Sequence, residues 1–153
     1  MTSHSPPNAR DREPAGNRSG EGAHFNWPIE MGKAREFGLA CLDPLFSDPT
    51  HVPITFPEVA THFWEPPESR SGFGDLDLSR LLHGEQEFVY DRPIMIGENL
   101  AGYTRLKDQY VKEGRRGGNM RFTIYETVFV DQNEAVVMRS TRTLVEVRER
   151  PDD

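Results

Sequence analysis

The stretch HGEQEFVYDRP, which runs from His83 to Pro93, decides the predicted fold of this chain. Phe88 and Tyr90 alternate with polar residues there, as they do in a β-strand that buries one face. The chain after this stretch consists of further alternating segments, whereas the chain before it contains helical patterns and a proline-rich connection. This order predicts an α+β domain whose sheet begins near His83.

Three later segments have the same two-residue period and are rich in β-branched and aromatic residues, namely 99–112, 120–131 and 135–147. The glycine-rich loop 113–119 and the tight turn 131–134 separate them, so we expect an antiparallel meander of hairpins. Segment 99–112 would be about 45 Å long at ~3.3 Å per residue, and we therefore expect it to bend or to contain a bulge.

The segment 120–131 carries apolar or aromatic side chains on both of its faces. Phe122, Ile124 and Val128 fall on one face, and Tyr125 and Phe129 fall on the other. A helix can cover only one face of the sheet, so we expect a second protein surface to pack against the other.

Ahead of the sheet, the segment from Ile29 to Cys41 has the four-residue spacing of a short amphipathic helix. This helix would present Phe37, Ala40 and Cys41 to the core. Prolines then follow at short intervals, and they prevent any regular element in the connection.

A second, short helix is expected from about Pro57 to Glu65. Thr55 would cap it, and Glu58 would complete a capping box. The polar, glycine-rich segment 68–79 that follows is typical of a surface loop.

The composition limits the classes of partner and the location. Residues 1–24 lack apolar periodicity and are rich in polar residues, Pro and Gly, which predicts a disordered tail ahead of a single domain over residues 25–150. The net charge of −7 argues against a nucleic-acid partner, because binding phosphates needs a basic face. The chain has neither a long apolar run nor an apolar signal segment, so we expect no membrane association and a cytoplasmic location.

Cys41 is the only cysteine, so the chain has no internal disulfide framework and no thiolate cluster for zinc. A nucleophilic role for Cys41 would need a basic neighbour, and none is near in the sequence, which favours a buried, inert thiol. His51 and His62 are too isolated in the sequence to suggest metal ligands. We therefore expect neither a metal nor a cofactor.

Four short stretches carry a family resemblance. They read PIEMGKAREF at 28–37, VPITFP at 52–57, HGEQEF at 83–88 followed by Arg92-Pro93 and Gly97, and KEGRRGG at 112–118. In this order they resemble the MaoC-like dehydratases and (R)-specific enoyl-thioester hydratases, and in particular the N-terminal, non-catalytic half of these proteins.

The resemblance implies the hot-dog fold, in which a curved antiparallel sheet wraps around a central helix. It implies an acyl substrate carried as a thioester on coenzyme A or acyl carrier protein, with water added or removed across the bond next to the thioester carbonyl. It also implies two associated hot-dog units, one catalytic and one that accommodates the acyl chain. The expected partner is a catalytic MaoC-like chain or a second copy of this chain. In related proteins the acyl tail lies beside a short central helix, and the helix predicted here is short.

The resemblance also locates the catalytic pair, an aspartate and a histidine in a G-D-x-N-P-x-H loop after the first helix. In this sequence Cys41 and Phe46 occupy those positions, and neither can act as the acid or the base that moves a proton. Other alignments recover Asp43 or His51, but not both together. We therefore favour a non-catalytic half.

A fallback acid–base pair is His83 with Glu85, which we expect on the same face of the strand. A structural role for His83, in which it donates a hydrogen bond to a carbonyl at the start of the strand, is the alternative. Arg115 and Arg116 at the hairpin tip would meet the phosphates of coenzyme A, or else form a solvated turn. The complete set of expected substrate-binding residues is Pro53, Thr55, Phe56, His83, Gly84, Arg115 and Arg116.

Three functions are compatible with the sequence. We favour the acyl-accommodating subunit of a heteromeric enoyl-CoA hydratase or 3-hydroxyacyl-thioester dehydratase, itself lacking the Asp–His pair. The second is a self-sufficient homodimeric hydratase or thioesterase that uses His83 or His51. The third is a non-enzymatic protein that binds acyl thioesters.

Overall fold

The computed structural model describes residues 22–43, 50, 52–66, 76–114 and 118–148. Most of the predicted tail lies outside these residues, so the predicted domain boundaries stay a prediction. In chain order the elements are β1 (Phe25–Pro28), α1 (Met31–Ala40), α2 (Glu58–Phe63), the 3-10 turn η4 (Leu78–Arg80), β2 (Leu81–Tyr90), β3 (Asn99–Glu113), β4 (Asn119–Val130) and β5 (Val136–Arg148).

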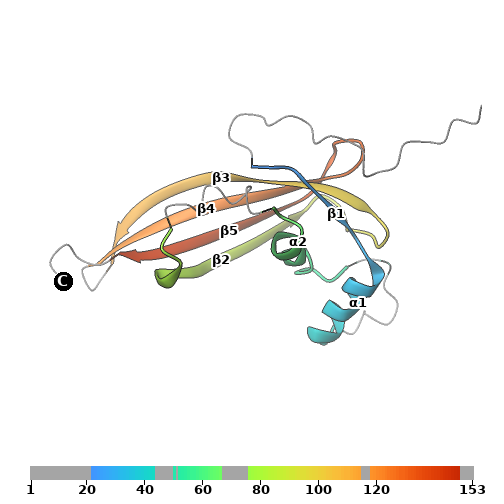
Figure 1. The fold of residues 1–153 in the computed structure, drawn as a ribbon, viewed down its shortest axis with the longest axis horizontal. Helices are drawn as coiled ribbons and strands as arrows, with labels where there is room; N and C mark the ends of the chain where they lie inside the picture. The colour runs from blue at the N-terminus through green and yellow to red at the C-terminus, as the bar shows by residue number, and fades with distance from the viewer. Residues whose placement is uncertain (1–21, 44–49, 51, 67–75, 115–117, 149–153) are drawn as a thin grey trace, which may run out of the picture.

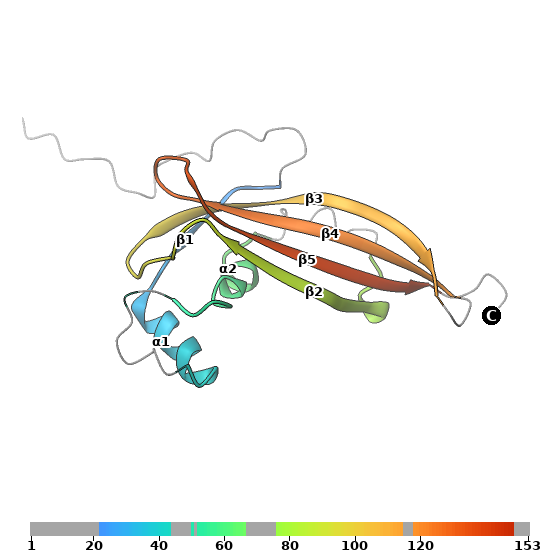
Figure 2. The ribbon, with the colours of Figure 1, turned by 180° about the vertical axis from the view of Figure 1, so that it is seen from behind.

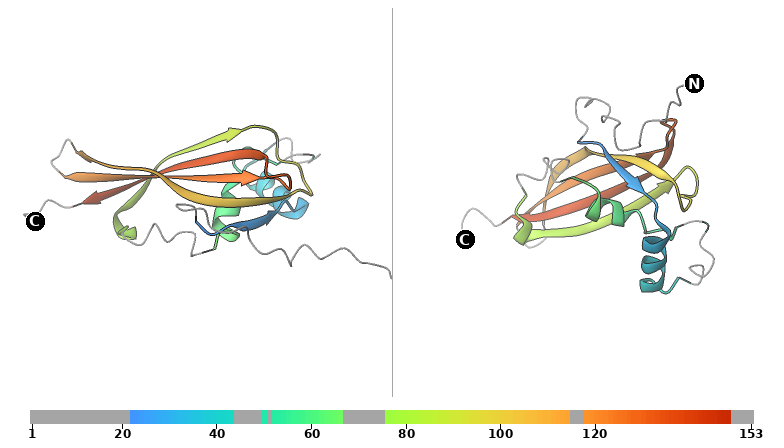
Figure 3. Two further views of the ribbon diagram at one scale, coloured as in Figure 1. Left: turned by 90° about the horizontal axis from the view of Figure 1, so that it is seen from above. Right: turned by 45° about the vertical axis from the view of Figure 1, so that its right-hand side comes forward.

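The five strands form one antiparallel sheet in the order β1-β3-β4-β5-β2. The sheet is curved, α2 lies on its concave side, and α1 lies beyond one end (Figures 1 and 2). The face toward α2 is called the inner face below, and the opposite one the outer face. The long strands extend well past both helices, so much of the sheet projects away from them (Figure 3). The predicted meander of β3, β4 and β5 is confirmed.

The register of the ladder shifts at three places, one of them between Phe129 and Val130 beside the β4–β5 turn, and the other two are bulges at the same level of the sheet. In β3 the register shifts between Leu106 and Asp108, which confirms the expectation that this long strand is irregular. In β2 it shifts between His83 and Glu85. The two bulges are level because one row of paired residues joins them. Asp108 pairs with Ile124 of β4, Ile124 pairs with Thr143 of β5, and Thr143 pairs with Glu85. Because a bulge bends and twists its strand, the curvature of the sheet concentrates at this level.

The strand β1 was not predicted, because four residues ending in a proline are too short to show a period. Phe25 and Trp27 are nevertheless buried, and β1 pairs with β3 at the edge of the sheet. The Trp27 ring lies 5.6 Å from the ring of Phe56 and 5.2 Å from that of Phe129, centroid to centroid. Phe37 of α1 meets Phe56 edge to face at 5.5 Å. This aromatic cluster joins β1, α1, the connection before α2 and β4.

The buried side of α1 differs from the predicted one. Ala34 and Gly38 are buried, Phe37 is half-buried, and Ala40 and Cys41 are exposed. The prediction of a buried thiol at Cys41 is therefore wrong. The helix ends at Ala40 with Cys41 as its C-cap, and the row of small residues faces the core because it permits a close approach of the helix backbone.

The start of α2 also differs from the prediction. Pro57 is the N-cap residue and no side chain caps the helix, so the predicted capping box of Thr55 and Glu58 is wrong. The φ angle of Pro57, −58°, is already helical and starts the turn without a cap. The Tyr90 hydroxyl donates a hydrogen bond to the carbonyl of Ile54 and ties this connection to the end of β2. Burial, and to a lesser extent the nearby Glu58 carboxylate, raise the pKa of Tyr90, so it remains a donor.

The predicted tight turn between β4 and β5 is present. The Asp131 carboxylate accepts hydrogen bonds from the backbone N–H groups of Asn133 and Ala135, at 2.9 and 3.0 Å, and Glu134 adopts a φ of 61°. These hydrogen bonds lower the pKa of Asp131. Within the described ranges, no helix is long and apolar enough to cross a membrane.

One close contact predicts the response to a small substitution. A Cβ added at Gly102 would lie 2.5 Å from Cζ of Phe25, so Gly102→Ala must displace the ring and with it β1. We expect the free energy of unfolding to fall by about 1–3 kcal/mol, as measured by urea unfolding.

Gly32→Ala is the control for this experiment. A Cβ at Gly32 would meet nothing within 4 Å, and alanine favours the helical state by about 1 kcal/mol over glycine. We expect no loss of stability there. If Gly102→Ala leaves the free energy of unfolding unchanged, or if both variants lower it equally, the contact between Gly102 and Phe25 does not have this role.

Candidate functional site

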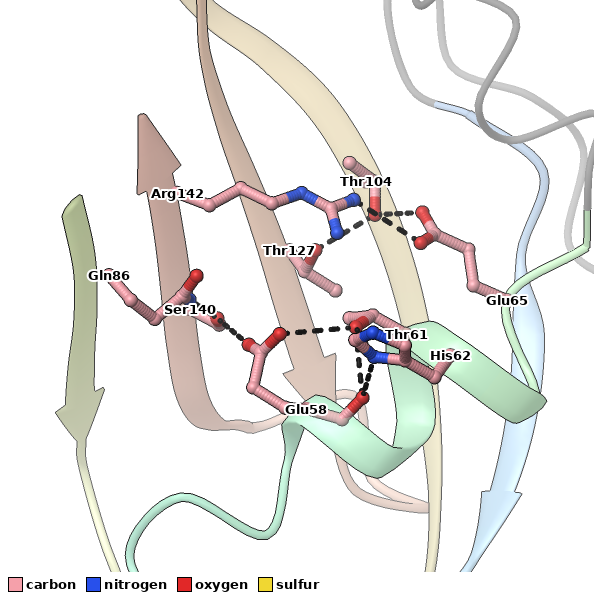
Figure 4. A network of polar contacts seen from close by, with 9 residues as sticks. All are labelled: Glu58, Thr61, His62, Glu65, Gln86, Thr104, Thr127, Ser140 and Arg142. Carbon is pink, nitrogen blue, oxygen red and sulfur yellow. Dashed lines mark hydrogen bonds and ion pairs between the residues drawn. The ribbon is translucent and has the colours of Figure 1, made fainter. Parts of the chain in front are cut away.

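A layer of polar side chains fills the space between α2 and the inner face of the sheet (Figure 4). Glu58 and Thr61 come from α2, and Glu65 follows just after it. Thr61 and Glu65 are buried, with exposed fractions of 2% and 5%. The layer is completed by side chains from four strands, which the two-residue period places on the inner face. These partners are Gln86 of β2, Thr104 of β3, Thr127 of β4, and Ser140 and Arg142 of β5.

Glu65 is the centre of one half of this layer. One of its carboxylate oxygens accepts a hydrogen bond from the Thr104 hydroxyl at 2.5 Å, and the other lies 3.3 Å from Nη2 of Arg142. The hydroxyls of Thr104 and Thr127 are 2.8 Å apart. The Glu65 side chain is fully buried and the Arg142 side chain is 14% exposed. This is a buried ion pair, whose two charges depend on each other because both have left water.

Glu58 is the centre of the other half. One of its carboxylate oxygens accepts from the Ser140 hydroxyl at 3.3 Å, and the other lies 3.4 Å from the Thr61 hydroxyl. The side-chain amide of Gln86 in turn donates to Ser140 at 2.5 Å. The two halves together connect α2 to β2, β3, β4 and β5. The surface that faces α2 here is polar and hydrogen-bonded.

Arg142 also contacts the part of the inner face beyond α2. Its guanidinium carbon lies 6.0 Å from the centre of the Tyr125 ring, within the range of a cation–π contact. Burial raises the pKa of Tyr125, although the Arg142 and Arg121 cations oppose this shift. The ion pair therefore stands at the boundary between the part of the sheet that α2 covers and the part that projects.

The positions of the expected catalytic pair are described only in part. Cys41 is the exposed C-cap of α1. Asp43, the alternative to Cys41, donates its backbone N–H to the Gly38 carbonyl at 2.9 Å. Phe46 and His51 lie outside the described residues. Of the acid–base alternatives, only His83 with Glu85 is fully described.

The expected pairing of His83 and Glu85 on one face is wrong. His83 lies opposite Leu144 and Glu85 lies opposite Thr143, and neighbouring residues of β5 point to opposite faces. The bulge at Gly84 inserts one residue between them, which reverses the alternation. A ring nitrogen of His83 instead donates to the carbonyl of Glu85 at 3.1 Å, which is the structural role considered above.

The other expected binding residues do not gather at one place. Phe56 is buried in the aromatic cluster, Thr55 is exposed, and the Pro53 carbonyl accepts from the backbone of Phe56 at 3.0 Å. These residues lie near Tyr90, at the end of β2, whereas His83 and Gly84 lie near its beginning. Arg115 and Arg116 are outside the described residues. The polar layer was not predicted as a site. Arg142 falls at an inward position of a strand, and a charge there indicates a buried partner.

The fold defines the class of protein. A curved antiparallel sheet with a short helix on its inner face is the hot-dog fold, as expected. One chain of the HadBC (3R-hydroxyacyl-ACP dehydratase) complex of Mycobacterium tuberculosis shares it with a TM-score of 0.57 and 18% identity, over 81% of this chain and 95% of that chain. One chain of the ChsH1-ChsH2 complex of the same organism has a TM-score of 0.57 and 16% identity, over 88% of this chain and 91% of that chain.

The sequence places the chain within this class. Residues 30–140 match the model of the FAS1-like dehydratase domain region. The UPF0336 protein of Thermobifida fusca (strain YX) is 32% identical over 139 residues, which cover 78% of this chain and 84% of that protein. The chain belongs to the family of FAS1-like dehydratase domain regions, and the predicted resemblance to MaoC-like dehydratases is confirmed. Its correspondence to an N-terminal, non-catalytic half stays a prediction.

The buried ion pair predicts a double-mutant result. Arg142→Met should lower the free energy of unfolding by about 3–5 kcal/mol, because it leaves the Glu65 carboxylate buried without its cation. The double variant Glu65→Leu, Arg142→Met should recover most of this loss, because apolar residues of similar volume often replace a buried ion pair at little cost. Urea unfolding of the single and double variants measures both effects.

Arg139→Met is the matched control. Arg139 is on the same strand, and its partner Asp91, at 3.1 Å, lies in an exposed ion pair. Such a pair contributes at most about 1 kcal/mol. Equal losses in the Arg139 and Arg142 single variants, or no recovery in the double variant, would show that the Glu65 pair does not act as a buried unit.

Proposed function

We propose that this chain is the acyl-accommodating, non-catalytic subunit of a heteromeric enoyl-thioester hydratase or 3-hydroxyacyl-thioester dehydratase. A second hot-dog chain would supply the Asp–His pair, and the substrate would be a thioester of coenzyme A or acyl carrier protein. Under this proposal the chain itself needs no metal or cofactor. Membership of a dehydratase family supports the class of reaction. The residues at the two catalytic positions, Cys41 and Phe46, support the division of labour.

The observation that carries the proposal is the edge of β2. This strand of 10 residues pairs with β5 on one side and ends the sheet on the other. Leu82 and Val89 on it are 58% and 44% exposed, and Ile54, whose carbonyl accepts from Tyr90 at the end of this strand, is 73% exposed. A long strand edge flanked by apolar side chains favours pairing with another strand. Two solved proteins that share the fold are described as complexes, HadBC and ChsH1-ChsH2, which is consistent with a hot-dog partner.

The acyl chain would lie against the inner face, beside the end of α2. The helix has only six residues and covers only part of this face (Figure 1). Beyond it, the side chain of Leu106 shares the inner face with Tyr125 and is 53% exposed. An alkyl chain laid there would remove this apolar surface from water. The catalytic pair of the partner would act at the thioester end of the same substrate.

Hydration of but-2-enoyl-CoA tests the proposal. The purified chain alone should give no loss of the enoyl-thioester absorbance above the buffer rate. A hot-dog partner that carries the Asp–His pair should restore the reaction, and a partner with that aspartate changed to asparagine should not. Turnover by the lone chain that disappears in His83→Ala or His51→Ala would contradict the proposal and favour the self-sufficient enzyme.

The β2 edge can be tested separately from catalysis. Replacing Leu82 and Val89 together by lysine should abolish association with the partner, because two charges then lie on the outer face directly beside the paired edge. Size-exclusion chromatography of the mixed chains measures this association. Val111→Lys is the control, since Val111 is equally exposed, at 59%, but lies on β3, on the other side of β4 and β5. Unchanged association in the double variant would exclude this edge.

A further inference from the structure

We propose that the outer face of the sheet binds a second copy of this chain in a symmetric dimer, whose two-fold axis runs parallel to the strands between β4 and β5. This inference concerns a different surface from the β2 edge, and it does not rest on the proposed function. A partner at the β2 edge lies beside the sheet, whereas the second copy is stacked on the sheet. One chain therefore has room for both.

An apolar row crosses four strands on the outer face of the projecting part. Thr127 faces α2, so the two-residue period directs Phe122 of the same strand outward. The ladder places Tyr110, Val145 and Leu82 on the same level as Phe122. The rings of Tyr110 and Phe122 are stacked at 4.9 Å, and Leu82 is 58% exposed. None of the described helices lies on this side of the sheet (Figure 1), so the row is open to a second protein surface.

A charged row crosses the same face about 13 Å away, four residues along β4 at ~3.3 Å per residue. It contains Arg105 of β3, Glu126 of β4 and Glu87 of β2. The cations of Arg105 and Lys107 both contact the Glu126 carboxylate, and their side chains remain 46% and 48% exposed. Glu85 and Glu87 are exposed on the other side of the face. The β3 side therefore has two cations against one buried carboxylate, and the β2 side is anionic.

These charges select one way of stacking two copies. A two-fold axis parallel to the strands exchanges the two sides of the sheet and preserves each level, so β3 of one copy faces β2 of the other. Arg105 and Lys107 of each copy then face Glu87 of the other, and the apolar row faces itself. An axis across the strands would bring the cations against cations and the carboxylates against carboxylates, which is unfavourable. Asp108 is the exception, because it is level with Glu85, but its carboxylate already accepts from the next backbone N–H at 2.8 Å.

The twist of the sheet is compatible with these contacts. Packed sheets lie about 10 Å apart, with their strands about 30° from parallel alignment. The strands β3 and β2 lie roughly 7 Å from the axis at ~4.8 Å per strand, so this angle displaces their facing residues by only about 4 Å. The long side chains of Arg105 and Lys107 span such a displacement.

The size of the surface predicts the strength of the dimer. From Met120 to Val128 the face is about 30 Å long, and four strands are about 19 Å wide. Two copies therefore bury on the order of 1,100 Å², which is at the lower end of specific interfaces. We expect a dimer with a dissociation constant in the micromolar range, which dilution separates into monomers.

Sedimentation velocity of the purified full chain tests the inference, up to a concentration of about 0.5 mM. The wild type should change from monomer to dimer over this range, and Phe122→Lys should stay monomeric, because a charge then enters the apolar row. The matched control is Val111→Lys. Val111 is 59% exposed, pairs with the neighbour of Phe122 in the sequence, and so lies on the inner face. It should dimerise like the wild type.

Glu87→Lys tests the direction of the axis. It should weaken the dimer about tenfold, because a lysine then faces Arg105 and Lys107 of the second copy. Raising the salt concentration should weaken the wild-type dimer in the same direction. Glu113→Lys is the control, since Glu113 is also exposed but belongs to the inner face of β3. It should have no effect on the dissociation constant.

The outcomes that overturn the inference are distinct. A wild-type chain that stays monomeric up to about 0.5 mM has no such interface, whatever the variants do. A dimer that persists in Phe122→Lys lies on another surface, and one that Glu87→Lys leaves unchanged does not have this axis. If Phe122→Lys does not fold, Thr143→Lys replaces it, because Thr143 lies beside the axis on the same face. Hydration in the presence of the catalytic partner decides the proposed function independently, since Phe122 is two strands away from the β2 edge.

Discussion

The short helix α2 depends on the groups that hold it, because six residues do not form a stable helix alone in water. On its N-terminal side, Phe56 anchors the chain in the aromatic cluster around Trp27. On its C-terminal side, Glu65 is held by Arg142 and Thr104. One anchor is apolar and the other is ionic, and between them they fix the distance of α2 from the sheet. The shape of the inner face, and therefore any function of that face, follows from these two attachments.

Local patterns predicted most of the sheet. The two-residue period identified β3, β4 and β5, because it depends on neighbouring residues only. The length of β3 implied a bend or a bulge without its position, which the structure gives as Leu106 to Asp108. The predictions failed where a tertiary contact decides the outcome. β1 exists because Phe25 and Trp27 find a place in the core, and the buried side of α1 is set by what packs against Ala34 and Gly38. A single inserted residue, Gly84, reversed the expected faces of β2.

The polar layer under α2 was beyond sequence reasoning for a related reason. Glu65 and Arg142 are 77 positions apart, so their meeting depends on the register of strands that no local period specifies. The family resemblance directed attention to the loop after α1 and to the hairpin arginines instead. A charged residue at an inward strand position, such as Arg142, is the one feature that indicates a buried partner from the sequence, since an unpaired charge there would be strongly destabilising.

The two bulges give the sheet a line of mechanical weakness. The bulges lie on β3 and β2. The strands β4 and β5 run between them, and Ile124 pairs with Thr143 there at the same level. Bulged residues leave the ladder locally disrupted, so bending is easiest along this line. The part that carries α2 and the aromatic cluster can stay rigid while the projecting part changes its angle.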